Sequence, residues 1–231
     1  MAKHGKKYKE AEAKLVADKK YALAEGISKI KELAHAKFDE SIDAHINIGI
    51  DPSKGEQAVR GSVLLPNGTG KKVRIVVFAK GDYAEKARKA GADFVGADDL
   101  VEKISGGWLE FDYAVATPDI MGMVGKLAKL LGPKGLLPNK KVGTVTFDVA
   151  DIVQDLKKGR VFFKNDKNAI VHFTFGKKSF DVKQLEENIN AFLKALASSK
   201  PPTSKGRFIK KVTITATMGP SVPVNLDAIK L

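Results

Sequence analysis

Three threonines near the C-terminus alternate with apolar residues and lead into a Met-Gly-Pro sequence. Thr213, Thr215 and Thr217 would point to one face of a β-strand, because side chains alternate along a strand. Hydroxyl groups in such a row can hydrogen-bond the 2′-hydroxyls and base edges of RNA. Met218 would then pack on a sugar or base, and Gly219 would admit a close backbone. The same residues equally fit a solvent-facing threonine stripe that ends in a turn.

A segment of mixed charge precedes another strand pattern. Phe163, Lys164, Asp166 and Lys167 stand at the turn before His172. One interpretation is an ordinary hairpin. The other is a rim for RNA, because lysine contacts phosphate and a histidine or phenylalanine ring can stack on a base.

A helical pattern changes to a strand pattern at Lys37, Phe38 and Ser41. Phe38 would be a core residue there on the general burial preference of phenylalanine.

A loop rich in glycine and proline, residues 132–139, is the most unusual stretch of the chain. It contains Lys134, Gly135 and Asn139, and Lys141 follows it. Such a sequence predicts an irregular, rigid loop. Its lysines either are solvated on a packing loop or contact phosphate.

The sequence lacks the residues that several kinds of catalytic site require. The four histidines, His4, His35, His45 and His172, show no short-spaced pairing, so we expect no metal site. The chain has no cysteine, which excludes disulfides and thiolate catalysis and fits a reducing cytosol. The glycine-rich nucleotide-binding fingerprints are absent, and we expect no cofactor.

The positive charge is uneven along the 231 residues. The net charge is +13, of which +2 lies in residues 1–67, +3 in residues 68–158 and +8 in residues 159–231. Six basic residues and no acidic one lie between Asn188 and Leu226. A solvated face explains such a run, but a polyanionic partner also requires one. The longest apolar run has five residues, against roughly 20 for a membrane span, so we expect no membrane partner.

These residues need elements that position them, and the apolar periodicity predicts those elements. Helices are expected at 10–36, 83–90, 97–104, 119–131, 149–157 and 182–196. Strands are expected at 42–50, 59–65, 73–79, 93–95, 113–116, 161–164, 169–175 and 208–216.

The middle third differs from the two ends. Its strands and helices alternate through short loops, which is typical of a parallel α/β sheet. The ends share half-buried strands, long helices and the basic excess. We therefore expect an α/β protein of two domains, with residues 1–67 and 159–231 forming one split domain and residues 68–158 inserted into it.

Several motifs resemble, in order along the chain, the family of large-subunit ribosomal protein one, found on the mobile lateral stalk. The longest match runs from Thr117-Pro118-Asp119 through Leu131–Asn139 to Val142-Gly143-Thr144-Val145. Lys140 departs from the proline expected after Asn139. The other matches are Glu32-Leu33-Ala34, Ala36-Lys37-Phe38, Gly49-Ile50-Asp51, Val59-Arg60-Gly61, Ala90-Gly91-Ala92-Asp93, Asn165-Asp166-Lys167 and Thr217-Met218-Gly219-Pro220.

The resemblance implies a split α/β domain that binds stalk ribosomal RNA and an inserted Rossmann-like, three-layer α/β domain. It also implies a place on the cytoplasmic ribosome among other ribosomal components, contact with exit-site tRNA, and repression of the protein's own mRNA. The RNA contacts that it carries over are Lys37, Phe38, Ser41, Lys164, Asp166, Lys167, His172, Thr215, Thr217, Met218 and Gly219. The loop of Lys134, Gly135, Asn139 and Lys141 is a secondary contact.

Two other functions remain open from the residues alone. The middle α/β segment is of a kind that supports nucleotide-dependent enzymes, although the phosphate-binding fingerprint is missing. The charge alone also fits a protein that binds tRNA or DNA without preference for the stalk.

Overall fold

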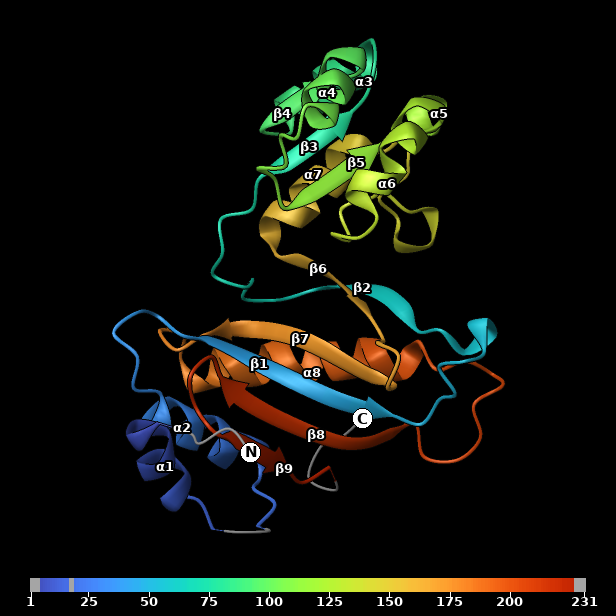
Figure 1. Ribbon diagram of the computed structural model, residues 1–231. Coiled ribbons are helices and arrows are strands. Elements are labelled where there is room, and N and C mark those ends of the chain that lie inside the picture. The colour runs from blue at the N-terminus through green and yellow to red at the C-terminus, as the bar shows by residue number, and fades with distance from the viewer. Residues whose placement is uncertain (1–4, 17–18, 227–231) are drawn as a thin grey trace. The chain divides into compact units, whose positions relative to one another are not determined.

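The first and last thirds of the chain build one four-stranded antiparallel sheet (Figure 1). The computed structural model describes residues 5–16 and 19–226, except for the side chain of Lys141. The strand order is β7-β1-β8-β9, so β1 lies between two strands that follow it by more than a hundred residues. The four strands are β1 (Ser41–Ile48), β7 (Ile170–Lys177), β8 (Ile209–Ala216) and β9 (Ser221–Val224).

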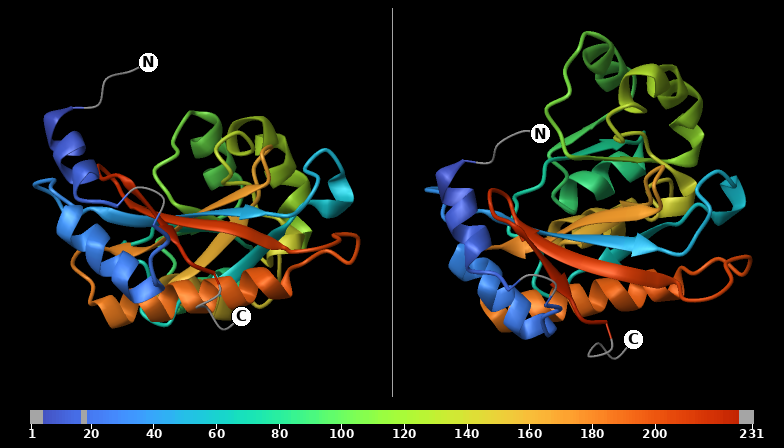
Figure 2. Two further views of the ribbon diagram at one scale, coloured as in Figure 1. Left: turned by 90° about the horizontal axis from the view of Figure 1, so that it is seen from below. Right: turned by 60° about the horizontal axis from the view of Figure 1, so that its bottom comes forward.

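Two helices cover one face of this sheet. Figure 2 shows α2 (Leu23–Leu33) and α8 (Val182–Ser198) along the same side of the strands. Alternate strand residues point toward them and are buried, as the sequence pattern predicts. The rings of Phe173 and Phe192 stack within this core with centroids 3.8 Å apart.

Phe163 also belongs to this core. It is buried, and its ring lies edge-on to Phe192 at 5.1 Å between centroids. The sequence had left open that this phenylalanine stacks on a base. That option is wrong for Phe163, because its strand turns the ring inward. Phe163 lies on β6 (Arg160–Lys164), which pairs with β2 (Arg60–Leu64) in a separate two-stranded sheet.

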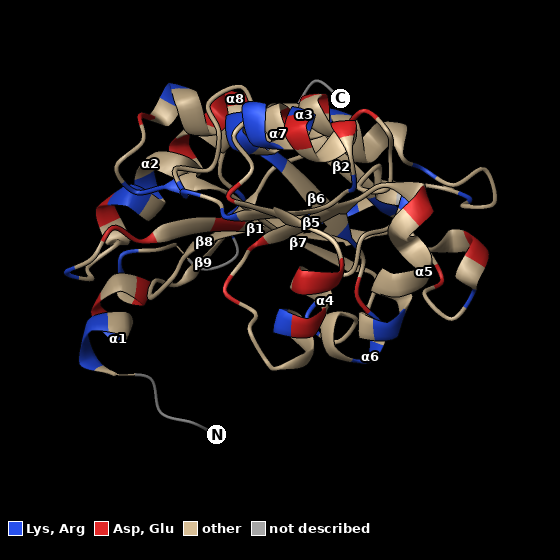
Figure 3. Cartoon of the chain, turned by 90° about the horizontal axis from the view of Figure 1, so that it is seen from above, with Lys and Arg blue, Asp and Glu red and all other residues tan. Residues whose placement is uncertain are grey.

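The middle of the chain forms a parallel three-stranded sheet in the order β4-β3-β5. All four residues of β3 are buried, which explains the continuous β-branched run. Figure 3 shows α3 and α7 on one side of β5, and α4, α5 and α6 on the other. The elements are β3 (Ile75–Phe78), α3 (Asp82–Lys89), β4 (Phe94–Gly96), α4 (Asp98–Ser105), β5 (Tyr113–Ala116), α5 (Met121–Val124), α6 (Ala128–Leu131) and α7 (Val149–Lys158).

The chain divides into two compact units. One comprises the described residues up to Gly70 and from Val161 onward, and the other is Lys71–Arg160. Each unit has a core of its own. Short 3-10 helices complete them at η1 (Gly55–Gln57), η2 (Pro118–Ile120), η3 (Gly125–Leu127) and η4 (Lys140–Val142).

The helix expected over residues 10–36 is two helices, α1 (Lys6–Ala13) and α2. Tyr21 lies between them and pairs with the end of β9 instead. Its N–H donates to Pro223 O at 3.0 Å, and its carbonyl accepts from Asn225 N at 2.8 Å. The prediction was wrong because this long-range pairing outweighs local helix propensity.

Two further expectations differ from the structure. The helix expected over residues 119–131 is broken into η2, α5, η3 and α6, and Gly122 and Gly125 weaken it in the middle. Strand β9 was not expected at all, because Pro220 and Pro223 argue against a strand. Since β9 is an edge strand, Pro223 costs the sheet no central hydrogen bond.

Candidate nucleic-acid interface

The face of the four-stranded sheet opposite α2 and α8 is polar. Residues that are exposed or half-buried alternate with the core residues on β1, β7 and β8. Strand register brings them into rows: Asp43 faces Thr174 and Thr215, and His45 faces His172 and Thr213. This polar face is therefore a continuous surface made from segments far apart in the sequence.

Thr217 joins β8 to the start of β1. Its hydroxyl oxygen accepts from Ser41 N at 3.1 Å and lies 3.2 Å from Ser41 O, and its own N–H donates to Ser41 O at 3.1 Å. A hydroxyl group has one proton and two lone pairs. One lone pair of the exposed Thr217 hydroxyl thus stays available for a partner.

Thr215 uses its hydroxyl within the protein. The oxygen lies 3.0 Å from Ala216 O, 3.2 Å from Gly219 O and 3.4 Å from Pro220 O. The single hydroxyl proton can satisfy these carbonyls only in turn. Thr215 therefore shapes the turn that presents Met218.

Gly219 sits in this turn with a backbone conformation that other residues also adopt. A Cβ atom there would meet Ala216 Cβ at 3.5 Å, an ordinary van der Waals distance. The fold therefore has no need of glycine at this position.

Two large apolar side chains stand out at this end of the sheet. Phe38 is 55% exposed and Met218 is 54% exposed. The expectation of a buried Phe38 is wrong, because the turn before β1 points the ring outward. Lys37 beside it is exposed as well. An exposed apolar pair next to hydroxyls and a lysine is suited to stacking on bases or sugars.

A second group lies toward the other end of β1. Asp166 Oδ1 accepts from Ile170 N at 2.7 Å and Asn168 N at 2.8 Å, and Oδ2 lies 3.5 Å from His172 Nε2. The hydrogen bond from Ile170 lowers the pKa of this carboxyl, and His172 lowers it further. Asp166 thus organises the turn that presents exposed Lys167.

The structure does not gather all the candidate residues at one point. Ser41 and His45, which lies opposite His172, are four residues apart on β1, or about 13 Å along the strand, and Thr215 lies opposite Asp43 between them. The first group contains Lys37, Phe38, Ser41, Thr215, Thr217, Met218 and Gly219. The second contains Asp166, Lys167 and His172, with the exposed Lys164 on neighbouring β6.

The glycine- and proline-rich loop belongs to the other unit. It contains no helix or strand, as its composition predicts, and Gly135 has a φ of +71°. Thr144 fixes the loop, since its hydroxyl oxygen accepts from Asn139 N at 2.7 Å. Lys134 and Gly135 are exposed, while the side chain of Lys141 lies outside the described part of the structure.

A family model places this chain among known proteins. The model described as the Ribosomal protein L1p/L10e family matches residues 30–220. The chain belongs to this family. The match includes most of both units and every candidate residue named above.

Membership of the ribosomal protein L1p/L10e family fixes the general role. The chain is a structural ribosomal protein that binds ribosomal RNA and other ribosomal components. The family is a non-enzymatic one, which outweighs the alternative of a nucleotide-dependent enzyme. None of the described helices is both long and apolar enough to span a bilayer.

Sequence reasoning missed part of the polar face of this L1p/L10e-family protein. Asp43 accepts a hydrogen bond from the Thr174 hydroxyl, and His45 Nδ1 lies 2.8 Å from His172 Nδ1. The polar positions that alternate with the isoleucines of β1 were the available signal. Among the described residues, no three metal-ligating side chains cluster.

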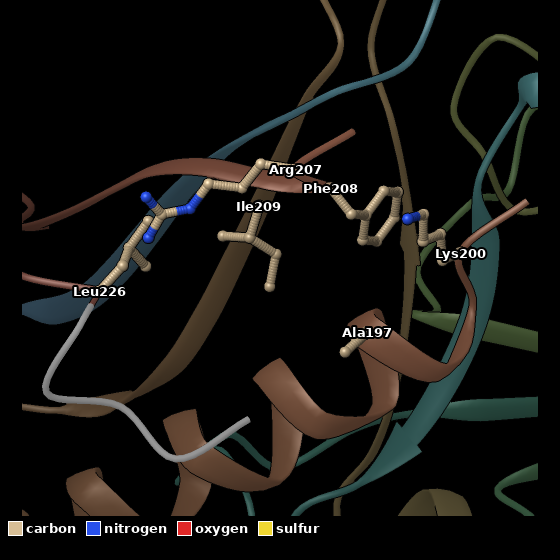
Figure 4. Close-up of a pocket in the computed structure, with 6 residues that line it drawn as sticks. All are labelled: Ala197, Lys200, Arg207, Phe208, Ile209 and Leu226. Atoms are coloured by element: carbon tan, nitrogen blue, oxygen red, sulfur yellow. The ribbon is translucent and has the colours of Figure 1, made fainter. Parts of the chain in front are cut away.

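A small pocket lies near the opposite end of β8 from Met218 (Figure 4). It encloses about 190 Å³, which is below the volume typical of small-molecule sites. Its lining is Ala197, Lys200, Arg207, Phe208, Ile209 and Leu226. Since Ala197 and Ile209 belong to the helix-covered side of the sheet, the pocket is no part of the polar face.

Proposed function

We propose that the polar face of the four-stranded sheet binds the stalk region of large-subunit ribosomal RNA. The observation that carries this proposal is the group of exposed Phe38, Met218 and Thr217 at one end of the face. Apolar rings and thioethers pack on unstacked bases, and a hydroxyl can bond a 2′-hydroxyl. The exposed lysines supply phosphate contacts.

The two units would divide this work. The unit made from both ends of the chain is the split RNA-binding domain, and Lys71–Arg160 is the inserted, Rossmann-like domain. The distribution of positive charge supports this assignment, since segments 1–67 and 159–231 hold +2 and +8 of the net charge of +13. The Lys134–Lys141 loop of the inserted domain would make a secondary contact.

The proposed function extends to two further RNAs. The protein would contact deacylated tRNA at the exit site and assist its release. It would also repress translation of its own mRNA through a site that imitates the ribosomal one. The resemblance of the chain to the stalk protein supports both.

The decisive experiment compares Met218→Asp with Val16→Asp. Both replace an exposed apolar residue, 54% and 63% exposed, and both add one negative charge. Filter binding against a stalk RNA fragment and a scrambled hairpin, at two salt concentrations, separates specific from electrostatic binding.

We expect Met218→Asp to weaken stalk binding at least tenfold, and Val16→Asp to leave its preference for the stalk fragment intact. A tenfold loss is about 1.4 kcal/mol, which lies within the range of about 1–3 kcal/mol for a lost stacking contact. Equal losses in the two variants would remove Met218 from the site. Equal binding of both RNAs by the wild type would refute the proposed function itself.

A further inference from the structure

Glu40 is the one carboxylate among the buried side chains of the described residues. It has 0% exposure, although its neighbours in the chain, Asp39 and Ser41, are exposed or half-buried. Burying a carboxylate is costly unless its oxygens find donors. The groups that donate hydrogen bonds to Glu40 therefore show which parts of the fold its burial stabilises.

Both oxygens of the Glu40 side chain accept backbone N–H groups. Oε1 accepts from Ala36 N at 2.7 Å, and Oε2 accepts from Met218 N at 3.1 Å. Ala36 and Met218 are 182 positions apart in the sequence and belong to different turns. One side chain thus ties the turn before β1 to the turn after β8.

The backbone of Glu40 connects these two turns to a third segment of the chain. Its carbonyl accepts from Lys178 N at 2.8 Å, and the ammonium group of Lys178 donates to Ala34 O at 2.6 Å. Asp39 next to it accepts from Ser179 N at 3.0 Å and from the Ser179 hydroxyl at 2.8 Å. The turn that carries Phe38 is therefore held from both sides.

The two turns joined by Glu40 are those that present Phe38 and Met218. Each of these side chains is more than half exposed, so neither is fixed by core packing. Their relative position depends on the backbone that carries them. A partner that contacts both gains affinity when that backbone is already in place.

We propose that Glu40 is a positioning residue, which fixes the Phe38 turn and the Met218 turn relative to one another in the geometry that RNA contacts. This inference rests on the proposed function of the polar face. Glu40 itself does not touch RNA, since it is buried.

The test uses Glu40→Gln in the full chain. Glutamine has nearly the same shape but offers one acceptor oxygen, and its amide donors would face a backbone N–H. Ile189→Val is a matched control, because Ile189 is fully buried on α8, on the covered side of the sheet. Both variants lose stability, but only Glu40→Gln loosens the two turns.

We expect Glu40→Gln to weaken binding of the stalk RNA fragment at least tenfold below the Ile189→Val variant, with an unchanged salt dependence. The salt dependence stays because no phosphate contact is lost. In addition, Met218→Ala should cost much less in the Glu40→Gln background than in the Ile189→Val background. Equal affinities in the two single variants, or fully additive losses, would overturn the proposal.

A second measurement covers the case in which Glu40→Gln does not fold. In the wild-type protein, amide hydrogen exchange at Ala36 and Met218 should be slow, although the Met218 side chain is exposed. Fast exchange at Met218 would overturn the proposal whatever the RNA does. Equal binding of stalk RNA and scrambled hairpin by the wild type would instead refute the proposed function. Slow exchange would still show that Glu40 holds the two turns together.

Discussion

His45 on β1 and His172 on β7 face each other across the sheet, with their Nδ1 atoms 2.8 Å apart. Such a contact needs one ring to donate and the other to accept. Protonating both rings would place two cations side by side. The pair lies on the polar face and therefore makes that face sensitive to pH.

The histidine pair predicts that acid destabilises the fold. Burial lowers the pKa of His45, and the neighbouring His172 lowers it further, against a smaller opposite effect of Asp43. The unfolded chain takes up this proton near pH 6.5, which is above the pKa in the fold. Between these two values the unfolded state holds more protons, so stability falls as the pH falls.

Urea unfolding at several pH values between 7.5 and 5 checks this expectation. His45→Asn should flatten the pH dependence of the unfolding free energy. His35→Asn is the control, because His35 lies outside the polar face, beside Leu33 O at 3.3 Å. An undiminished slope in His45→Asn would show that other groups dominate.

The same pair predicts that RNA binding takes up protons. A phosphate near the two rings would offset the repulsion of a second positive charge. The neighbouring carboxylates of Asp43 and Asp166 favour a protonated ring. The ammonium group of Lys211, two residues before Thr213 on β8, disfavours it. Affinity for stalk RNA should rise from pH 8 to pH 6, and His45→Gln should reduce that rise. Titrations at constant salt measure it.

Gly219→Ala should separate binding from folding. The added methyl group fits the fold, so stability should change by less than about 0.5 kcal/mol. If RNA approaches the bare backbone, affinity should drop about tenfold. Gly61→Ala is the contrasting variant, since its Cβ would lie 2.6 Å from Phe163 Cζ and destabilise the fold. Full RNA affinity in Gly219→Ala would exclude a close approach at this turn.

Lys167→Ala should act through charge alone. Lys167 is exposed beside the Asp166 turn, and a lost phosphate contact lowers the salt slope of binding by about one. Lys194→Ala removes the same charge from an exposed position on α8, on the helix-covered side of the sheet, and should leave the slope nearly unchanged. Identical salt slopes in the two variants would show that Lys167 makes no phosphate contact.

Asn188→Ala should be strongly destabilising. The buried amide of Asn188 accepts from Asn67 N at 3.0 Å and donates to Gly68 O and Phe175 O, both at 2.8 Å. The variant leaves three backbone groups without this partner, at a cost of about 2–4 kcal/mol. The exposed Asn47→Ala is the control, and chemical denaturation measures both.

The sequence was sufficient for elements whose pattern is local. The buried run of β3, the amphipathic stripe of α8 and the alternating faces of β7 all follow from periodicity, and the structure agrees with them. The break before α2 could not be predicted, because Tyr21 there pairs with Val224 across the whole chain. Strand β9 pairs with the adjacent β8, but its proline hides the strand pattern.

The candidate site shows the same limit. Alternation predicted a threonine row, and the family motifs pointed to Phe38 and Met218. Glu40 was missed because nothing local distinguishes a buried carboxylate from its solvated neighbour Asp39. The pairing of His45 with His172 was missed because it depends on the register between β1 and β7.

The position of β1 between β7 and β8 has a consequence for how the protein is made. Its two partner strands are synthesised more than a hundred residues later. Residues 71–160 form a contiguous unit with short-range strand pairing and can fold while the nascent chain is still growing. Until β7 and β8 emerge, β1 has two unpaired edges, so the polar face is the last part of the protein to form.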